Sequence, residues 1–486
     1  MMKLSGFFEK QLKDFDDAAC VRLLRLFSFF ALCAILYATV FSGFQIVDEF
    51  EHLHASWLVS IGKIPYVDFF EHHHPLLWYL SAPIVKLFYN NAIIFYVMRG
   101  ICFTASLLCV WFIYKIALFF GDKIVAWCAV AIYLGNLVTF YNFYQFRPDT
   151  FMNLCFICGL FFLFKHIQEK KISYLCISFF SFLLSFLFLQ KIGILLLMVS
   201  GIISWLLFAH VLKFRPTLIA AIFASVFSFL YSLLLYKSSM LPEYIELNYN
   251  FNLAMISYFT RGDLWYSNIF LTIYGLEFLA ALFFFRKENL YFKIISILFI
   301  CEFLMRGFYF APHPNYYTLL SMLGGLTLAV GIKRFMPSHK FWGVIIFTLF
   351  FVNLGHIINK LINSIDKYNS YRHYQLADFV HKNSEPNDLF MNGYDMNFNI
   401  YRADVSYYWF GLDMLLPIMK SEYNVNPVDV NALVVKYQPK FVYNRDYVDL
   451  KAMRTYGEIR YTQRFIPQIL AVLYKPTPFD DLLILK

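Results

Sequence analysis

Residues 172–211 read ISYLCISFFSFLLSFLFLQKIGILLLMVSGIISWLLFAHV, which is two apolar blocks joined by a polar pair. Each block is about 20 residues long, the length that a helix needs to cross a hydrocarbon core about 30 Å thick. Gln190 and Lys191 stand between the blocks and mark a short hairpin. This stretch therefore predicts two membrane-spanning helices that run in opposite directions.

The same pattern continues on both sides of this hairpin, and it predicts an α-helical polytopic membrane protein with about eleven transmembrane helices. The chain is 60% hydrophobic and only 15% charged, whereas soluble domains are about 25% charged. The predicted spans are 24–44, 93–115, 124–143, 150–166, 172–190, 192–211, 217–236, 268–286, 293–311, 315–332 and 341–360. The transmembrane domain thus occupies residues 24–360.

Basic residues gather in alternate loops between these spans, which orients the protein. Lysine and arginine concentrate on the cytoplasmic side of membrane proteins, so we expect the tail 1–23 to be cytoplasmic. The other loops assigned to that side carry Lys115, Lys123, Lys165, Lys170, Lys171, Lys213, Arg215, Arg286, Lys287, Lys293, Lys333, Arg334 and Lys340. The net charge of +9 is explained by these loops, and no nucleic-acid partner is expected.

Residues 76–89 decide on which side of the membrane the chain ends. The segment is short and contains Pro83 and Lys86, which favours a helix lying at the outer surface over a further span. Residues 361–486 are then extracytoplasmic, and a bacterial inner membrane is the default location. This tail is predicted to be a small α/β domain with a helix at 371–382 and strands at 388–393, 440–446 and 469–475.

Polar residues collect on the outer side of this topology. The first outer loop, 45–92, contains Asp48, Glu49, Glu51, Asp68, Glu71, His52, His54, His72, His73 and His74. Further outer corners carry Arg147, Asp149, Lys191 and the stretch 312–317, and Arg99 and Arg306 lie near the outer ends of their spans. Ionisable groups at membrane depth usually mark function. We expect one site in which carboxylates handle an acceptor or a metal and cations hold a phosphate.

Four motifs occur in the order found in a known superfamily. The first is the Asp48–Glu49 pair, followed by a Gly-x-x-Pro-Tyr-x-Asp-x-x-Glu pattern from Gly62 onward. The others are FRPDTF at 146–151, LQKIG at 189–193 and HPNYYTLL at 313–320. In this order the chain resembles the polytopic C-type (GT-C) glycosyltransferases, which include protein O-mannosyltransferases, lipid A aminoarabinose transferases and lipid A galacturonosyltransferases.

The resemblance implies an inverting sugar transfer from a polyprenyl-phosphate donor. Asp48 would be the main catalytic carboxylate, with Glu49 and Asp149 as further catalytic carboxylates. Lys191, Arg147 and Tyr316 would bind the donor phosphate. Some members bind a divalent metal, which would use Glu71 and His313 here. Because this chain has three consecutive histidines, 72–74, after Glu71, metal use and acceptor type stay open; the acceptor is a glycan, lipid A or protein.

Two other functions compete with this interpretation. A polysaccharide polymerase or ligase with a lipid diphosphate donor usually places key arginines in a large late outer loop, but 237–267 holds only Lys237 and Arg261. A transporter or flippase of lipid-linked sugars would show internal repeats and polar groups at mid-membrane. The sequence shows no such repeat, and its charges lie toward one face.

Overall fold

The computed structural model describes residues 17–43, 46–254, 264–308, 314–335, 351–359, 362–363, 369–392, 399–407, 429–443, 467–479 and 482–486. The chain divides into two compact units. The first, here called the helical unit, comprises Met1–Ser42, Gly100–Phe229 and Leu264–Tyr368. The second, the loop-and-sheet unit, comprises Gly43–Arg99, Leu230–Asp263 and Asn369–Lys486. Each is described by itself.

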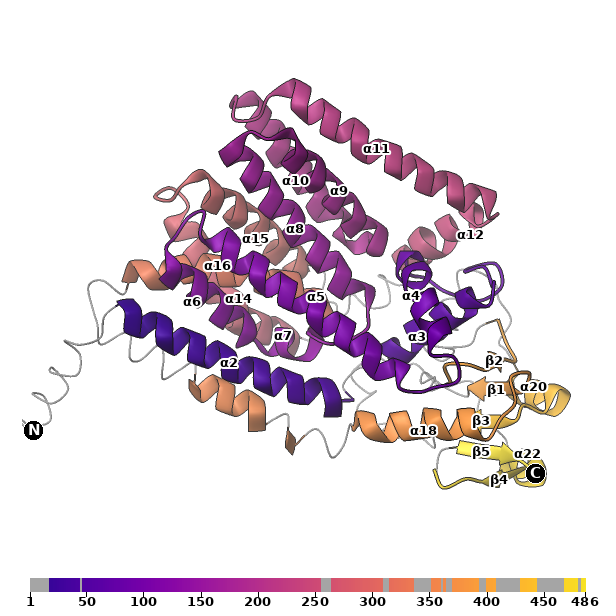
Figure 1. The fold of residues 1–486 in the computed structure, drawn as a ribbon. Helices are drawn as coiled ribbons and strands as arrows, with labels where there is room; N and C mark the ends of the chain where they lie inside the picture. Colours follow the sequence, from indigo (N-terminus) through magenta and orange to yellow (C-terminus); the bar gives the residue numbers. More distant parts are fainter. Residues whose placement is uncertain are drawn as a thin grey trace, which may run out of the picture. The chain divides into compact units, whose positions relative to one another are not determined.

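Long apolar helices make up the helical unit. They are α2 (Asp17–Phe41), α5 (Ile94–Ala117), α6 (Lys123–Leu134), α7 (Leu137–Asn142), α8 (Pro148–Glu169), α9 (Ile172–Phe188), α10 (Gly193–Phe208), α11 (Phe214–Lys237), α14 (Leu264–Phe284), α15 (Leu290–Phe308) and α16 (Thr318–Phe335), of which α5 and α11 belong to it for most of their length. Helix α8 packs along α9, and α16 packs against α6, α14 and α15 (Figure 1).

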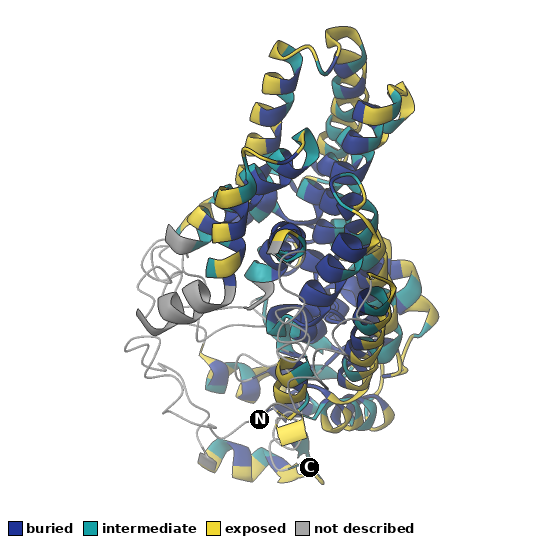
Figure 2. Ribbon diagram, turned by 90° about the vertical axis from the view of Figure 1, so that its left-hand side faces the viewer, coloured by how far each residue is buried: buried dark blue, intermediate teal, exposed yellow. Residues whose placement is uncertain are grey.

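Length and composition mark this chain as an integral membrane protein. Within the part of the chain that the structure describes, five helices are long and apolar enough to cross a membrane: α2, α5, α8, the helix from Gln190 to Phe208, and α11. Figure 2 shows buried residues along the interior of the packed helices and exposed ones on their outward faces. On α11 the exposed residues include Phe229 and Leu234. An apolar surface of this kind suits a lipid environment.

One predicted span is not a single helix. The sequence predicted one helix over 124–143, but the structure has α6 and α7 with a break at Gly135 and Asn136. The Asn136 side chain accepts a hydrogen bond from the backbone N–H of Val138 at 2.9 Å and caps α7. Asparagine at this position starts a new helix because its side chain satisfies a free N–H of the first turn. Of the predicted span 341–360, residues 341–350 and 360 lie outside the described residues.

The first loop contains two helices in the loop-and-sheet unit. Helix α3 (Ile46–Ser60) was missed from the sequence, and α4 (Leu76–Leu87) is the short helix expected there. The buried side chains Ile46, Phe50, Leu53 and Trp57 follow a helical period along α3 and could have revealed it. The unit also contains α12 (Leu241–Ile245) and a π-helical turn at Glu246–Asn250.

The carboxy-terminal part of this unit contains a five-stranded sheet. Its strand order is β2 (Ala403–Asp404), β1 (Leu389–Asn392), β3 (Phe441–Tyr443), β5 (Leu482–Leu485) and β4 (Tyr474–Pro476). The first three strands run parallel and β5 is antiparallel to β3 and β4. Helices α18 (Ser370–Lys382), α20 (Val430–Tyr437) and α22 (Pro467–Leu473) belong to the same unit. Met391, Val434, Val442 and Leu470 are part of the buried core.

The predictions for this region are partly confirmed. The helix over 371–382 is present as α18, and the predicted strands at 388–393 and 440–446 contain β1 and β3. The predicted strand 469–475 is wrong, because residues up to Leu473 form α22 and only the last two belong to β4. A short apolar run does not distinguish a strand from a helix, and here Pro467 at the first helical position favours a helix.

Candidate active site

An ion-pair cluster lies where α8 begins in the helical unit. Pro148 opens the helix, Arg147 occupies the N-cap position and Asp149 lies in the first turn. The Asp149 carboxylate pairs with the Arg147 guanidinium at 3.4 Å and forms a second, shorter contact with the Lys191 ammonium. The helix N-terminus also favours a negative charge at Asp149. These contacts fix the Asp149 carboxylate and hold Lys191 in place.

Tyr316 and Arg306 extend this cluster. The Lys191 Nζ lies 4.1 Å from the centre of the Tyr316 ring, and the Arg306 guanidinium lies 5.7 Å from the same ring. Arg306 donates from Nε to the buried Glu302 carboxylate at 2.8 Å. Three cations therefore meet two carboxylates, which leaves one excess positive charge. Such a centre attracts an anion like a phosphate.

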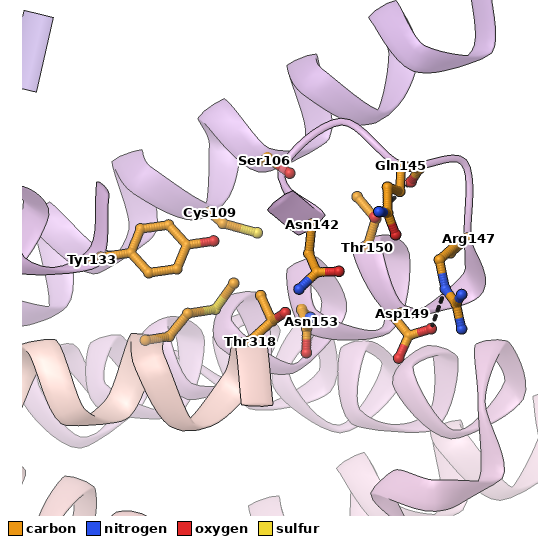
Figure 3. Close-up of a pocket in the computed structure, with 11 residues that line it drawn as sticks. Ser106, Cys109, Tyr133, Asn142, Gln145, Arg147, Asp149, Thr150, Asn153 and Thr318 are labelled. Atoms are coloured by element: carbon orange, nitrogen blue, oxygen red, sulfur yellow. Dashed lines mark hydrogen bonds and ion pairs between the residues drawn. The ribbon is translucent and has the colours of Figure 1, made fainter. Parts of the chain in front are cut away.

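A small polar cavity adjoins Asp149. Its lining includes Asn142, Gln145, Thr150 and Asn153, whose amide and hydroxyl groups surround it (Figure 3). It offers about 10 Å³ to the centre of a water molecule, which is roughly the space that one ordered water requires. Burial lowers the pKa of Arg147 to about 10, so this arginine stays charged at neutral pH.

The two acidic residues that open α3 have different surroundings. Both lie in the first turn of the helix. Glu49 is fully buried, and its two carboxylate oxygens accept hydrogen bonds from Nε of Arg99 at 3.0 and 3.2 Å. Arg99 is equally buried, and its guanidinium lies 4.3 Å from the Phe95 ring centre. Asp48 is partly exposed. Glu49 thus serves as the partner of a buried arginine, whereas Asp48 can face a substrate.

Glu71 belongs to a compact group of possible metal ligands in the loop-and-sheet unit. One ligand atom from each of Glu51, Glu71, His72 and His73 lies within 4.8 Å of the others. His73 Nδ1 is 3.2 Å from Glu51 and 3.3 Å from Glu71. The buried Oε1 atom of Glu71 accepts no hydrogen bond from the described residues.

The pKa shifts of Glu51, Glu71 and His72 in this group suit the binding of a cation. Burial raises the pKa of Glu71 to about 8, and burial together with the charge of Glu71 raises the pKa of Glu51 to about 7. Burial and the nearby His73 lower the pKa of His72, which keeps its imidazole neutral and able to bind a metal. Carboxylate and imidazole ligands suit zinc and related divalent ions. The residues present therefore fit a divalent cation.

Part of the chain matches a known protein family, and its fold matches a solved structure. Residues 72–235 match the family model of dolichyl-phosphate-mannose-protein mannosyltransferases. No curated protein matches the chain. The structure of ArnT from Cupriavidus metallidurans bound to undecaprenyl phosphate superposes with a TM-score of 0.62 at 12% identity, over 88% of this chain and 93% of ArnT. At this identity the likeness shows that the chain shares the fold of ArnT.

Two further solved structures are similar to this chain. ArnT from the same organism in the apo state has a TM-score of 0.51 at 12% identity, over 75% of this chain and 73% of its own. The oligosaccharyltransferase of Archaeoglobus fulgidus has a TM-score of 0.49 at 11% identity, over 88% of this chain and 70% of its own. The likeness to ArnT in both states concerns the fold.

The structure brings together one part of the site predicted for a C-type glycosyltransferase. Asp149, Arg147, Lys191 and Tyr316 form a single cluster within the helical unit. Asp48, Glu49 and Glu71 belong to the loop-and-sheet unit. His313 lies outside the described residues, so its predicted metal role stays a prediction.

Some features of this candidate site were missed from the sequence. Glu51 was grouped with the loop carboxylates but given no role, although it stands three positions after Asp48, which places both on the same side of a helix. Recognising α3 as a helix would therefore have placed Glu51 beside Asp48. The pairing of Glu49 with Arg99 spans 50 positions and carries no local sequence signal.

Proposed function

We propose that the chain is a membrane glycosyltransferase that moves a sugar from a polyprenyl-phosphate donor to an extracytoplasmic acceptor. The observation that carries the proposal is a cluster of cations: Arg147 and Lys191 pair with Asp149, and Arg306 lies near the Tyr316 ring that also contacts Lys191. The chain shares its fold with a protein that was solved bound to undecaprenyl phosphate. The match to a dolichyl-phosphate-dependent family over residues 72–235 supports a donor of the same lipid-phosphate class.

Lys191 and Arg147 would hold the donor phosphate. The bond between the anomeric carbon and the phosphate oxygen breaks during transfer, and negative charge grows on the departing lipid phosphate. Fixed cations in a water-poor site stabilise that charge strongly because they need no reorganisation. Asp149 orients Lys191 by ion pairing, and the Tyr316 ring covers the ammonium.

Asp48 would act as the general base. The acceptor hydroxyl attacks the anomeric carbon from the face opposite the phosphate, and this attack inverts the configuration. The proton of the hydroxyl passes to the Asp48 carboxylate. General-base assistance is typically worth about 10²–10⁴ in rate. Glu49 would hold Asp48 in position, because its hydrogen bond with Arg99 anchors the first turn of α3, which carries both residues.

A divalent cation would bind to Glu51, Glu71, His72 and His73. When bound, it would supply the positive charge that these two buried carboxylates lack and would act as a Lewis acid at the first loop. The four residues would hold the loop in one conformation, which keeps the neighbouring α3 in register. The predicted ligand His313 adds to this set only if it approaches Glu71.

The finer topology belongs to the same proposal. Eleven spans would place the tail 1–23 in the cytoplasm and a small α/β domain, 361–486, outside, in a bacterial inner membrane. Asp48, Asp149 and Lys191 would then all lie on the extracytoplasmic side. The acceptor class is open among glycan, lipid A and protein, because no contact described above selects one of them.

Transfer of a labelled sugar in proteoliposomes tests the proposal. Asp48→Asn should abolish transfer from polyprenyl phosphate while the protein level stays unchanged. Asp68→Asn is the matched control, because Asp68 is an exposed carboxylate of the same loop that accepts a hydrogen bond from the N–H of Ile64. If lipid-linked sugar crosses the membrane and no glycoside forms, the chain is a flippase; if only a lipid diphosphate serves as donor, it is a polymerase or ligase.

A further inference from the structure

Residues 399–407 connect the carboxy-terminal sheet to the first loop within the loop-and-sheet unit. The segment forms the edge strand β2, in which Ala403 and Asp404 pair in parallel with Leu389 and Phe390 of β1. The N–H of Val405 donates to the carbonyl of Phe390 at 3.2 Å. The backbone of the segment is thereby fixed to the sheet, so its side chains can act as rigid supports.

Asp404 reaches α3 from this strand. The Asp404 Oδ2 lies 2.8 Å from Nε2 of His54, and His54 Nδ1 lies 3.1 Å from the carbonyl oxygen of Ile400. His54 is fully buried, and the Asp404 side chain is only 6% exposed. His54 stands on the same helix as Asp48 and Glu51. The contact therefore ties the helix that carries the proposed base to the sheet.

Both ring nitrogens of His54 face the 399–407 segment. The carbonyl of Ile400 only accepts hydrogen bonds, so Nδ1 of His54 donates to it. The Nε2 atom faces the Asp404 carboxylate at 2.8 Å. The Trp57 ring also packs against the imidazole, with its centre 5.2 Å away.

Tyr401 and Arg402 hold the end of α4. The Tyr401 hydroxyl donates to the carbonyl of Phe88 at 2.8 Å and lies 3.2 Å from that of Val85. Val85 lies in the last turn of the helix, where carbonyls lack an intrahelical N–H, and Phe88 is the C-cap residue. Arg402, which is 1% exposed, donates from Nη2 to the Asn90 side chain at 2.9 Å.

Tyr407 holds the stretch that leads to Glu71. Its hydroxyl donates to the carbonyl of Tyr66, and its own carbonyl accepts from the N–H of Phe70 at 3.0 Å. Phe70 directly precedes Glu71. The segment thus contacts the first loop at α3, at the end of α4 and beside the proposed metal ligands.

We propose that residues 399–407 position the first loop for the transfer reaction, with Asp404 acting on α3 through His54. This inference rests on the proposed function, because the loop carries Asp48 and the Glu51–Glu71 group. It gives the carboxy-terminal region a specific task, which is to fix the general base relative to its own loop. Asp404 is a positioning residue, since it contacts His54 and no reacting atom.

Two substitutions at position 404 separate positioning from general folding. Asp404→Ala removes the link. Asp404→Asn retains it, because an amide of the same shape can both donate and accept a hydrogen bond at the Nε2 side of His54. Asp378→Ala is the matched control: Asp378 pairs with Lys382 on the exposed side of α18 and makes no described contact with the loop.

Hydrogen–deuterium exchange of the full-length protein in lipid nanodiscs gives a readout that does not depend on activity. In Asp404→Ala, amides of 46–60 should exchange about tenfold faster than in wild type, the effect of losing one buried polar contact. Asp404→Asn and Asp378→Ala should stay near wild type. Equal exchange in all variants, or failure of the Asn variant to rescue, would overturn the inference.

Kinetics in proteoliposomes complete the test. Asp404→Ala should lower kcat about tenfold with the donor KM nearly unchanged, and Asp404→Asn should restore it. An unchanged kcat despite faster exchange would refute the positioning role.

If wild type transfers no sugar, the proposed function fails, and the exchange data still decide whether the segment holds the loop. Should the Ala variant not fold, Tyr407→Phe, which loses one bond to Tyr66, should accelerate exchange at 65–70; no change there would equally refute the inference.

Discussion

Single charged side chains in the helical unit have their positions set by partners far away in sequence. Lys191 comes from the hairpin before α10, yet it pairs with Asp149 and lies against Tyr316. An ammonium held in this way is ready to receive a phosphate without further ordering. The cost of fixing its side chain has already been met by folding.

Replacing Lys191 tests this arrangement. Lys191→Met should reduce sugar transfer by about 10²–10³, the usual effect of removing one group that stabilises transition-state charge. Lys213→Met, which changes an exposed lysine between α10 and α11, should leave the rate unchanged. Initial rates in proteoliposomes measure both. A Lys191 variant within twofold of wild type would contradict the assigned role.

The carboxyl pair of the first loop predicts a specific pH dependence. The pKa of each group is raised from 4.5 to about 7 for Glu51 and about 8 for Glu71. The folded protein therefore holds more protons than the unfolded chain between about pH 5 and 8, so its stability falls as pH rises through this range. A bound divalent ion would replace those protons and reverse the fall.

Thermal unfolding measures this effect. Chelator-treated protein should lose thermal stability between about pH 5 and 8, and added zinc should restore it near pH 8. Glu71→Gln should reduce the loss with pH and abolish the effect of zinc, because it removes one titrating carboxyl and one ligand. Glu243→Gln, at an exposed carboxylate of α12, should change neither. Identical unfolding of chelated and zinc-treated protein across this range would argue against a metal at this cluster.

Among the helices, α8 and α9 show how two membrane segments approach closely. A Cβ atom at Gly159 would lie 2.7 Å from the Phe182 ring. The Ser178 and Ser185 hydroxyls of α9 donate to backbone carbonyls of α8 at Gly159 and Met152, both at 2.8 Å. Small residues and interhelical hydrogen bonds hold membrane helices together where burial from water does not drive association.

Alanine substitutions at two glycines test this contact. Gly159→Ala should destabilise the protein by about 1–3 kcal/mol, because a methyl group in a filled interface forces the ring to move. Gly201→Ala on α10 meets no atom within 4 Å and should stabilise by about 0.5–1 kcal/mol through helix propensity. Denaturation in detergent compares the two. Equal effects at both positions would disprove close packing at Gly159.

Element by element, the sequence predicted best where one local property decides the structure. The apolar blocks from 24 to 335 correspond to helices because their length and composition match a lipid environment. It failed at α3, whose polar residues obscured a helical period, and at α22, whose short apolar run fits either state. Asn136 shows that a cap within an apolar block divides a helix, a signal present but outweighed by hydropathy.

For the whole molecule, the proposed topology predicts which residues can be labelled from outside. In a variant without the nine cysteines, single cysteines at Asp68 and at Lys171, both exposed, should react with an impermeant maleimide from opposite sides. A cysteine at Lys191 should share the outer side with Asp68, provided that it reacts at all. Labelling of positions 68 and 191 from opposite faces would disprove a common cavity.

The sequence by itself determined that this chain is a helical membrane protein and which polar corners to inspect, because hydropathy and motif order are local properties. The tertiary structure alone decided which charges meet: Glu49 with Arg99, Glu51 with Glu71, and His54 with Asp404. Such pairs are separated by up to hundreds of positions, and a buried charge finds its partner through the fold. No local sequence pattern identifies partners that are so far apart. The partners of these carboxylates could therefore be assigned only from the tertiary structure.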